Sequence, residues 1–216
     1  SFLGAANGAT VTVDLGAVAN PVFSLSPDAG SSIALATPSD IVFGNAIIGE
    51  GTVRKTGTGL LKLTGSNSGH IVVQEGSVQV GNGTASIRWG GAGSSVTLEN
   101  GTSLIIAGNS SGNSHHTIGS DLILGTNASD AVSLKWVDAS QANATNYQHD
   151  FTGTVTVNGA VSLVGRDNWA KEMGFTGTLT GAGSLTYSRG AGDGRYNANG
   201  KLIISGDASG FTGMIT

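Results

Sequence analysis

The chain contains no cysteine and only 3 prolines, at positions 21, 27 and 38. Without cysteine there is no disulfide framework and no thiol nucleophile, and the chain suits export in an unfolded state, in which a premature disulfide would block passage. Because proline cannot donate to a β-ladder, its absence after position 38 favours uninterrupted backbone pairing downstream. No apolar run approaches the ~20 residues that a membrane-spanning helix needs.

Charge is also scarce, since only 11% of the residues are charged, roughly half the usual fraction. The net charge is −4, and the 10 basic residues are scattered along the chain rather than gathered in a stripe. This distribution argues against a nucleic-acid partner, which requires a basic surface. The hydrophobic share is still 38%, mostly aliphatic, so the chain can bury a core and is expected to fold.

Glycine is abundant, with 36 of 216 residues against a usual share of roughly 7%. Between the glycines lie short runs in which apolar and polar residues alternate, most clearly in residues 48–80. Each run puts two aliphatic residues on one face of an extended strand. Short strands with regular turn residues indicate an all-β fold. The predicted strands of the first part are Thr10–Leu15, Pro21–Leu25, Ser32–Leu35 and Asp40–Phe43, and the later apolar pairs are Leu61/Leu63, Ile71/Val73, Val78/Val80, Ile87/Trp89, Val96/Leu98, Leu104/Ile106, Leu122/Leu124 and Val132/Leu134.

Internal repeats distinguish a solenoid from a sandwich or a barrel. The sequence Phe-Thr-Gly occurs at 151–153, 175–177 and 211–213. A longer repeat aligns residues 49–55 with 181–187 and residues 59–65 with 200–206, which requires an insertion at 189–199. We therefore predict that residues 1–216 form one continuous β-solenoid of about nine rungs, each of roughly 20–25 residues, with glycine at the corners.

The repeat resembles the passenger-associated transport repeat of bacterial autotransporters. The first copy matches at Gly51, Lys55, Gly57, Gly59, Leu61, Leu63, Gly65 and Asn67, and the second at Gly183, Leu185, Gly200, Leu202, Ile204, Gly206, Phe211 and Gly213. The best-matching segments are 48–81 and 174–216. The second copy departs from the pattern with Tyr187 in place of lysine, and the first is one residue short at Gly69-His70.

This resemblance implies a single-stranded right-handed parallel β-helix exported by type V secretion. It implies a partner in the same protein, a C-terminal outer-membrane β-barrel that is absent from these residues, so we expect the chain to be a segment of a longer passenger domain. The expected location is the cell surface of a Gram-negative bacterium, or secreted and anchored at its outer membrane. The expected role is a structural stalk and an export and folding element, within an adhesin that contributes to virulence.

Two charged excursions, 164–173 and 189–199, are the candidate binding segments. The first is predicted to form a short helical turn, and loops that leave a solenoid on one face can bind ligands. Arg and Tyr are enriched in contact hot spots, and Trp169 could stack on a sugar. The candidate ligand-binding residues are therefore Trp169, Arg189, Arg195 and Tyr196. A host glycan, a host surface protein or a second copy are the alternative partners, and ordinary loops without a ligand are the simplest interpretation.

An enzyme is the third hypothesis, namely a polysaccharide lyase or glycoside hydrolase with acidic residues stacked in one groove. The acidic candidates are Asp121, Asp130, Asp138, Asp150, Asp167, Glu172 and Asp193. They form no pair in the sequence, and turn aspartates explain them equally well. His115 and His116 are adjacent, so in a strand their rings point to opposite faces. His149 or His70 could join one of them from another rung, but we predict no metal, no cofactor and no catalytic residue.

Overall fold

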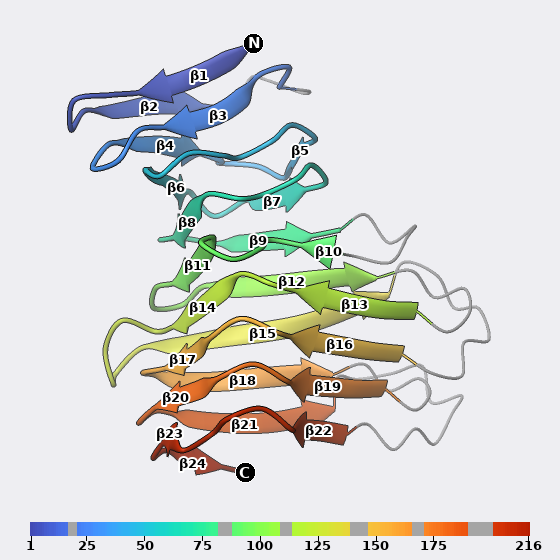
Figure 1. The fold of residues 1–216 in the computed structure, drawn as a ribbon. Coiled ribbons are helices and arrows are strands. Elements are labelled where there is room, and N and C mark those ends of the chain that lie inside the picture. The colour runs from blue at the N-terminus through green and yellow to red at the C-terminus, as the bar shows by residue number, and fades with distance from the viewer. Residues whose placement is uncertain (17–20, 82–87, 109–113, 139–146, 166–170, 190–200) are drawn as a thin grey trace.

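The computed structural model describes residues 1–16, 21–81, 88–108, 114–138, 147–165, 171–189 and 201–216. Within these residues every regular element is a β-strand, and every pair of neighbouring strands is parallel. No helix in this described part is long and apolar enough to cross a membrane. The strands stack into a tall coil with the N-terminus at one end and the C-terminus at the other (Figure 1).

Three long sheets form the sides of the coil. The nine-stranded sheet contains β2 (Thr10–Asp14), β4 (Ser32–Ala36), β6 (Thr52–Thr56), β8 (His70–Val73), β11 (Ser95–Leu98), β14 (Asp121–Leu124), β17 (Val155–Val157), β20 (Leu179–Gly181) and β23 (Gly210–Phe211). The eight-stranded sheet contains β5 (Ile41–Phe43), β7 (Leu60–Leu63), β9 (Ser77–Val80), β12 (Ser103–Gly108), β15 (Ala131–Asp138), β18 (Ala160–Gly165), β21 (Ser184–Arg189) and β24 (Met214–Ile215). The five-stranded sheet contains β10 (Arg88–Trp89), β13 (Ser114–Ile118), β16 (Tyr147–Phe151), β19 (Lys171–Phe175) and β22 (Lys201–Ile204).

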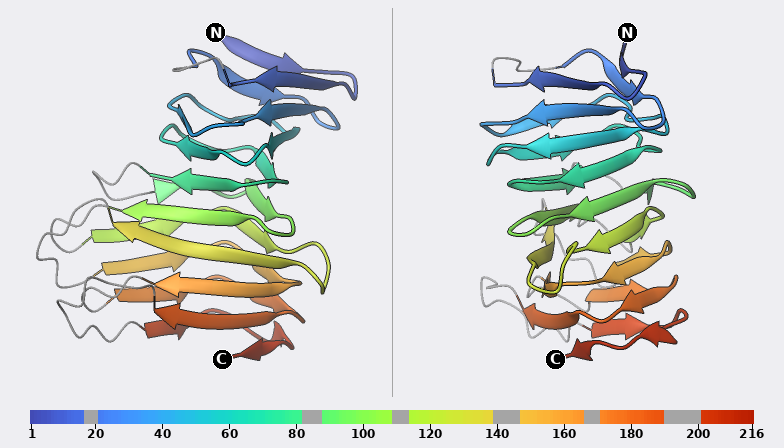
Figure 2. Two further views of the ribbon diagram at one scale, coloured as in Figure 1. Left: turned by 180° about the vertical axis from the view of Figure 1, so that it is seen from behind. Right: turned by 90° about the vertical axis from the view of Figure 1, so that its left-hand side faces the viewer.

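The chain visits the three sheets in rotation. From β12 in the eight-stranded sheet it passes to β13 in the five-stranded sheet, then to β14 in the nine-stranded sheet, and returns to β15 beside β12. In Figure 1 the strands β13, β16 and β19 lie in front and run to the left, whereas β12, β15 and β18 lie behind and run to the right, as the reverse view confirms (Figure 2). Since the coil descends from N to C, this direction of winding is right-handed. The chain is therefore a right-handed parallel β-helix.

The third face is incomplete in the N-terminal part of the coil. There β1 (Phe2–Ala5) pairs with β3 (Ser24–Pro27) as a two-stranded sheet. Single bridges then continue this face from Leu25 to Ile47 and from Ile47 to Asn67. In this part the coil has two full faces and one narrow one, and the third face widens only from β10 onward.

The core consists of the inward side chains of all three faces, aligned in columns along the coil. On the nine-stranded sheet, Val53, Ile71, Val96 and Leu122 are successive Cα partners, and each is fully buried. All the predicted apolar pairs within the described residues are buried, as are the tryptophans Trp89 and Trp136. Continuous columns of this kind exist because one rung alone cannot cover its apolar face, so each rung is buried by its neighbours.

The length of one turn varies more than predicted. It is 18 residues from Val53 to its partner Ile71, and 33 residues from Leu122 to its partner Val155. The long turns gain their extra residues between the eight-stranded and five-stranded sheets, for example in the interval from β15 to β16. Residues can be added there because the in-register strands on either side already hold the coil together.

Two expectations about local structure were wrong. The strand predicted at 21–25 lies at 24–27, because Leu25 and Pro27 supply the inward positions whereas Val22 is 81% exposed. The predicted helical turn at 164–173 is also wrong at both described ends. Residues 164–165 finish β18 and residues 171–173 begin β19, because both segments pair with strands of the neighbouring rungs.

Candidate functional site

The structure describes the ends of the two predicted binding excursions. Gly165 at the end of β18 is the Cα partner of Arg189 at the end of β21, and Glu172 in β19 is the partner of Lys201 in β22. Both excursions therefore leave and rejoin the coil on adjacent rungs at the same edge. Trp169, Arg195 and Tyr196 lie outside the described residues, as does the side chain of Arg189. Their role in ligand binding stays a prediction.

The described acidic candidates lie in separate elements: Asp150 is buried in β16, Asp121 begins β14, and Asp130 lies in the turn before β15. Asp121 lies exposed at the start of β14. Asp130 closes its own turn, since its Oδ2 accepts the Thr126 N–H at 2.7 Å and the Asn127 N–H at 3.1 Å. These hydrogen bonds hold the pKa of Asp130 below its usual value. Asp167, Asp193 and the side chains of Asp138 and Glu172 lie outside the described residues.

Of the three histidines whose side chains the structure describes, two lie in the core and one lies on the outer surface. His116 in β13 and His149 in β16 are Cα partners, and their buried rings stack with centroids 4.8 Å apart. The ring of Trp136 meets His149 edge-on at 5.5 Å. His70 lies on the outer surface of the nine-stranded sheet, where its Nδ1 is 2.9 Å from Ser95 Oγ. In the described part of the chain, no group of three His, Cys, Asp or Glu residues could hold a metal ion.

Among the residues that the structure describes, one lysine is buried completely. Lys55 points inward from β6, and its ammonium group donates hydrogen bonds to the carbonyl oxygens of Gly57 and Glu75, the latter at 2.7 Å. The Glu75 carboxylate in turn accepts the Gly57 N–H at 2.8 Å. Burial lowers the pKa of Lys55 to about 8, although the charges of Glu75 and Asp40 oppose this shift. This lysine of the repeat motif therefore closes a corner of the coil.

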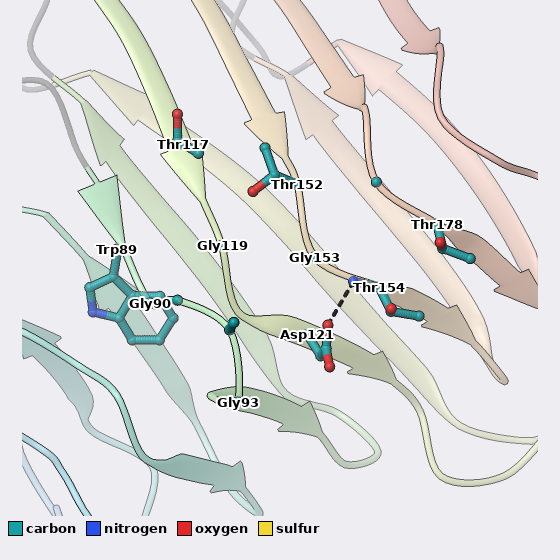
Figure 3. Close-up of a pocket in the computed structure, with 13 residues that line it drawn as sticks. Trp89, Gly90, Gly93, Thr117, Gly119, Asp121, Thr152, Gly153, Thr154 and Thr178 are labelled. Atoms are coloured by element: carbon teal, nitrogen blue, oxygen red, sulfur yellow. Dashed lines mark hydrogen bonds between the residues drawn. The ribbon is translucent and has the colours of Figure 1, made fainter.

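An open groove of about 700 Å³ lies along the corner where the five-stranded sheet passes into the nine-stranded sheet (Figure 3). It extends over the corners that follow β10, β13, β16 and β19. Its lining is rich in glycine and threonine and includes one charged residue. The lining residues are Trp89, Gly90, Gly91, Ala92, Gly93, Thr117, Gly119, Asp121, Thr152, Gly153, Thr154, Gly177 and Thr178.

Close stacking of the corners keeps the groove hollow. A Cβ atom on Gly153 would lie 2.6 Å from the carbonyl oxygen of Ser120, and one on Gly177 would lie closer still to the carbonyl oxygen of Gly153. Any side chain at these positions would push neighbouring rungs apart, so only glycine fits. The repeated Phe-Thr-Gly sequence therefore has a structural cause at 151–153 and 175–177, because each copy forms this same corner.

Backbone groups at the floor of the groove are already used between rungs. The carbonyl oxygen of Phe151 accepts the N–H groups of both Thr176 and Gly177 at 3.0 Å, and that of Trp89 accepts the Gly119 N–H at 2.9 Å. The polar side chains along the walls are four threonines and one carboxylate. Asp121 Oδ1 accepts the Thr154 N–H at 2.7 Å, as Figure 3 shows, which fixes this carboxylate beside the groove. Asp121 is the only charged side chain among the lining residues.

Sequence reasoning missed this groove. From the sequence, Asp121 is a candidate catalytic acid or a turn aspartate, and the repeated Phe-Thr-Gly indicates only internal repetition. The available signal was the recurrence of Thr-Gly-Thr at 152–154 and 176–178, which places hydroxyl groups on both sides of a glycine at the same corner. Trp89, a member of the predicted apolar pair Ile87/Trp89, is 3% exposed.

Comparison with known proteins identified no relative of this chain: no protein-family model, no curated protein and no solved structure matches it.

Proposed function

We propose that the chain is the stalk of a surface-displayed autotransporter passenger domain, where it acts as a rigid spacer and as an export and folding element. The observation that carries this proposal is the continuity of the coil. Buried aliphatic side chains form a continuous core through the described rungs from Leu15 to Leu185. Parallel backbone ladders join each rung to the next. Such a body supplies length and stiffness.

The same continuity supports folding from one end during export. Each completed rung presents an edge of unpaired N–H and C=O groups and a row of exposed aliphatic side chains. An arriving segment can pair with that edge immediately, because neighbouring rungs are only 17 to 33 residues apart in the sequence. Folding on the outer side of the membrane would then prevent the chain from sliding back.

The repeat motif adds a second, independent support. Lys55 and Gly57, two of the residues that resemble the passenger-associated transport repeat, close a corner through hydrogen bonds with Glu75 and with each other. The aligned copies do not occupy the same face, since Gly51 precedes β6 of the nine-stranded sheet and Gly183 precedes β21 of the eight-stranded sheet. The motif therefore corresponds to a corner followed by a strand in which every second side chain points into the core. That strand can lie in the nine-stranded or in the eight-stranded sheet.

A display experiment tests the proposal. The chain would be fused upstream of an autotransporter outer-membrane β-barrel in a Gram-negative host, and its arrival at the surface would be measured by protease accessibility on intact cells. We expect the wild-type chain to reach the surface. The variant Leu163→Asp, which places a charge among fully buried side chains, should fail to accumulate there. Ser162→Asp changes the neighbouring outward position of the same strand and serves as the matched control. Retention of the wild-type chain in the periplasm would exclude this function.

A further inference from the structure

The groove of Figure 3 has the shape of a site for an extended ligand. Its walls come from four successive corners, and neighbouring parallel strands lie 4.7–4.9 Å apart, so the lined length is about 15 Å along the axis of the coil. It is open to solvent along one side. A linear polymer can enter it from that side.

The chemistry of the walls favours a ligand rich in hydroxyl groups. Thr117, Thr154 and Thr178 contribute hydroxyls that can each donate and accept a hydrogen bond. The Thr152 hydroxyl already donates to the carbonyl oxygen of Ile118 at 3.4 Å and can still accept. Asp121 adds a strong acceptor, and its contact with the Thr154 N–H occupies one lone pair of one oxygen. Hydroxyl groups of a sugar match both kinds of partner, because they too donate and accept.

Other polymers fit less well. An anionic chain finds no cation among the lining residues and meets the negative charge of Asp121. An extended peptide is recognised chiefly through free backbone groups of a sheet edge or through apolar pockets. Here the backbone groups at the floor pair with neighbouring rungs, and Trp89, the largest apolar side chain of the lining, is buried in the core.

From this geometry we propose that the groove binds a neutral polysaccharide, which lies along the axis of the coil over the glycine floor and exchanges hydrogen bonds with the threonine hydroxyls and with Asp121. This site is separate from the two excursions. The excursions connect the eight-stranded to the five-stranded sheet, whereas the groove lies at the opposite ends of the five-stranded sheet's strands.

Native affinity electrophoresis of the purified chain tests the site. The gels would contain dextran, mannan, xylan or hydroxyethyl cellulose as neutral probes, polygalacturonate as an anionic probe, and gelatin as a peptide probe. We expect at least one neutral polysaccharide to retard the wild-type chain, and polygalacturonate and gelatin to leave its mobility unchanged. If no neutral polysaccharide retards it, or if gelatin or polygalacturonate retards it more strongly, the proposal is overturned.

Three groove variants locate the binding. Thr178→Trp fills the groove from an exposed position and should abolish retardation. Thr154→Val and Asp121→Asn each remove one polar interaction while preserving the size of the side chain, and each should weaken binding about threefold to tenfold. Thr97→Trp, on the outer surface of β11 and outside the groove, should bind as the wild type does.

Circular dichroism would confirm that each variant folds. If Thr178→Trp does not fold, Thr178→Val replaces it, with the same expected weakening as Thr154→Val. Unchanged retardation of the folded groove variants would overturn the proposal. The result is independent of the display experiment: a chain that reaches the surface but binds no polysaccharide refutes only the groove, and one that binds but is not displayed refutes only the stalk.

Discussion

At the scale of single residues, Lys55 shows how the fold accommodates a charge in its interior. Its aliphatic stem continues the inward column between Leu35 and Val73, and its ammonium group ends at two carbonyl oxygens of the corner. Burial lowers its pKa from 10.5 to about 8, so at neutral pH the folded chain still holds a desolvated charge. The hydrogen bonds offset this cost only in part.

This residue makes stability depend on pH in the alkaline range. Between pH 8 and pH 10.5 the unfolded chain binds more protons at Lys55 than the folded chain does, so raising the pH through this window favours the folded state. Urea unfolding from pH 7 to pH 10 should show the midpoint of the wild type rising relative to that of Lys55→Met. The control Lys62→Met, on the neighbouring strand β7, should keep the pH dependence of the wild type. Parallel curves for wild type and Lys55→Met would refute this account.

At the scale of elements, the corners rather than the strands limit which substitutions the fold tolerates. Gly177 stacks directly on the carbonyl oxygen of Gly153, whereas a Cβ atom on Gly91 would meet nothing within 4 Å. We therefore expect Gly177→Ala to lower the free energy of unfolding by about 1–3 kcal/mol, as overpacking does. Gly91→Ala, at the same corner, should be neutral or stabilising by up to about 1 kcal/mol. Thermal and urea unfolding would measure both, and equal effects of the two variants would contradict the stacking argument.

The strands themselves were largely predictable, because alternation of period two is a local property. The pairs Val78/Val80 and Val96/Leu98 are buried as predicted, since each lies in a run that has only one apolar face. The face on which a strand lies was not predictable. Alternation is the same on every face, and only the number of residues in each turn decides where the next strand falls.

The groove was out of reach for the same reason. Asp121 and Thr154 are 33 residues apart in the sequence, and they meet because an unusually long turn still returns in register. The inner pair of histidines is a similar case. Sequence reasoning considered His149 as a partner across rungs for His115 or His116, and the register selects His116. Without the lengths of the intervening loops, no spacing rule could have placed these residues side by side.

At the scale of the whole molecule, we expect the two ends of the coil to be adhesive surfaces. Phe2 in β1 and Met214 in β24 are 69% and 62% exposed, and they lie on terminal rungs at opposite ends (Figure 1). Each terminal strand leaves one backbone edge unpaired, which is a template for another chain. The isolated chain of residues 1–216 should therefore associate end to end as its concentration rises.

Analytical ultracentrifugation would measure this association. The substitutions Phe2→Lys and Met214→Lys place a charge at each end and should shift the chain toward the monomer. Val42→Lys, which replaces an exposed apolar residue on β5 within the coil, is the matched control and should associate as the wild type does. A wild-type chain that stays monomeric at every concentration would show that the ends are not adhesive.

The direction of the backbone ladders also determines how the molecule would respond to mechanical force. Hydrogen bonds between rungs run along the axis of the coil, so a pull on the two ends loads them one rung at a time, as in a zipper, instead of shearing a whole strand at once. Each released rung of 17 to 33 residues gives up a rise of about 4.8 Å and yields roughly 60–110 Å of extended chain. A tether built in this way lengthens in steps under tension and absorbs work at each step, while the rungs that remain closed keep their shape.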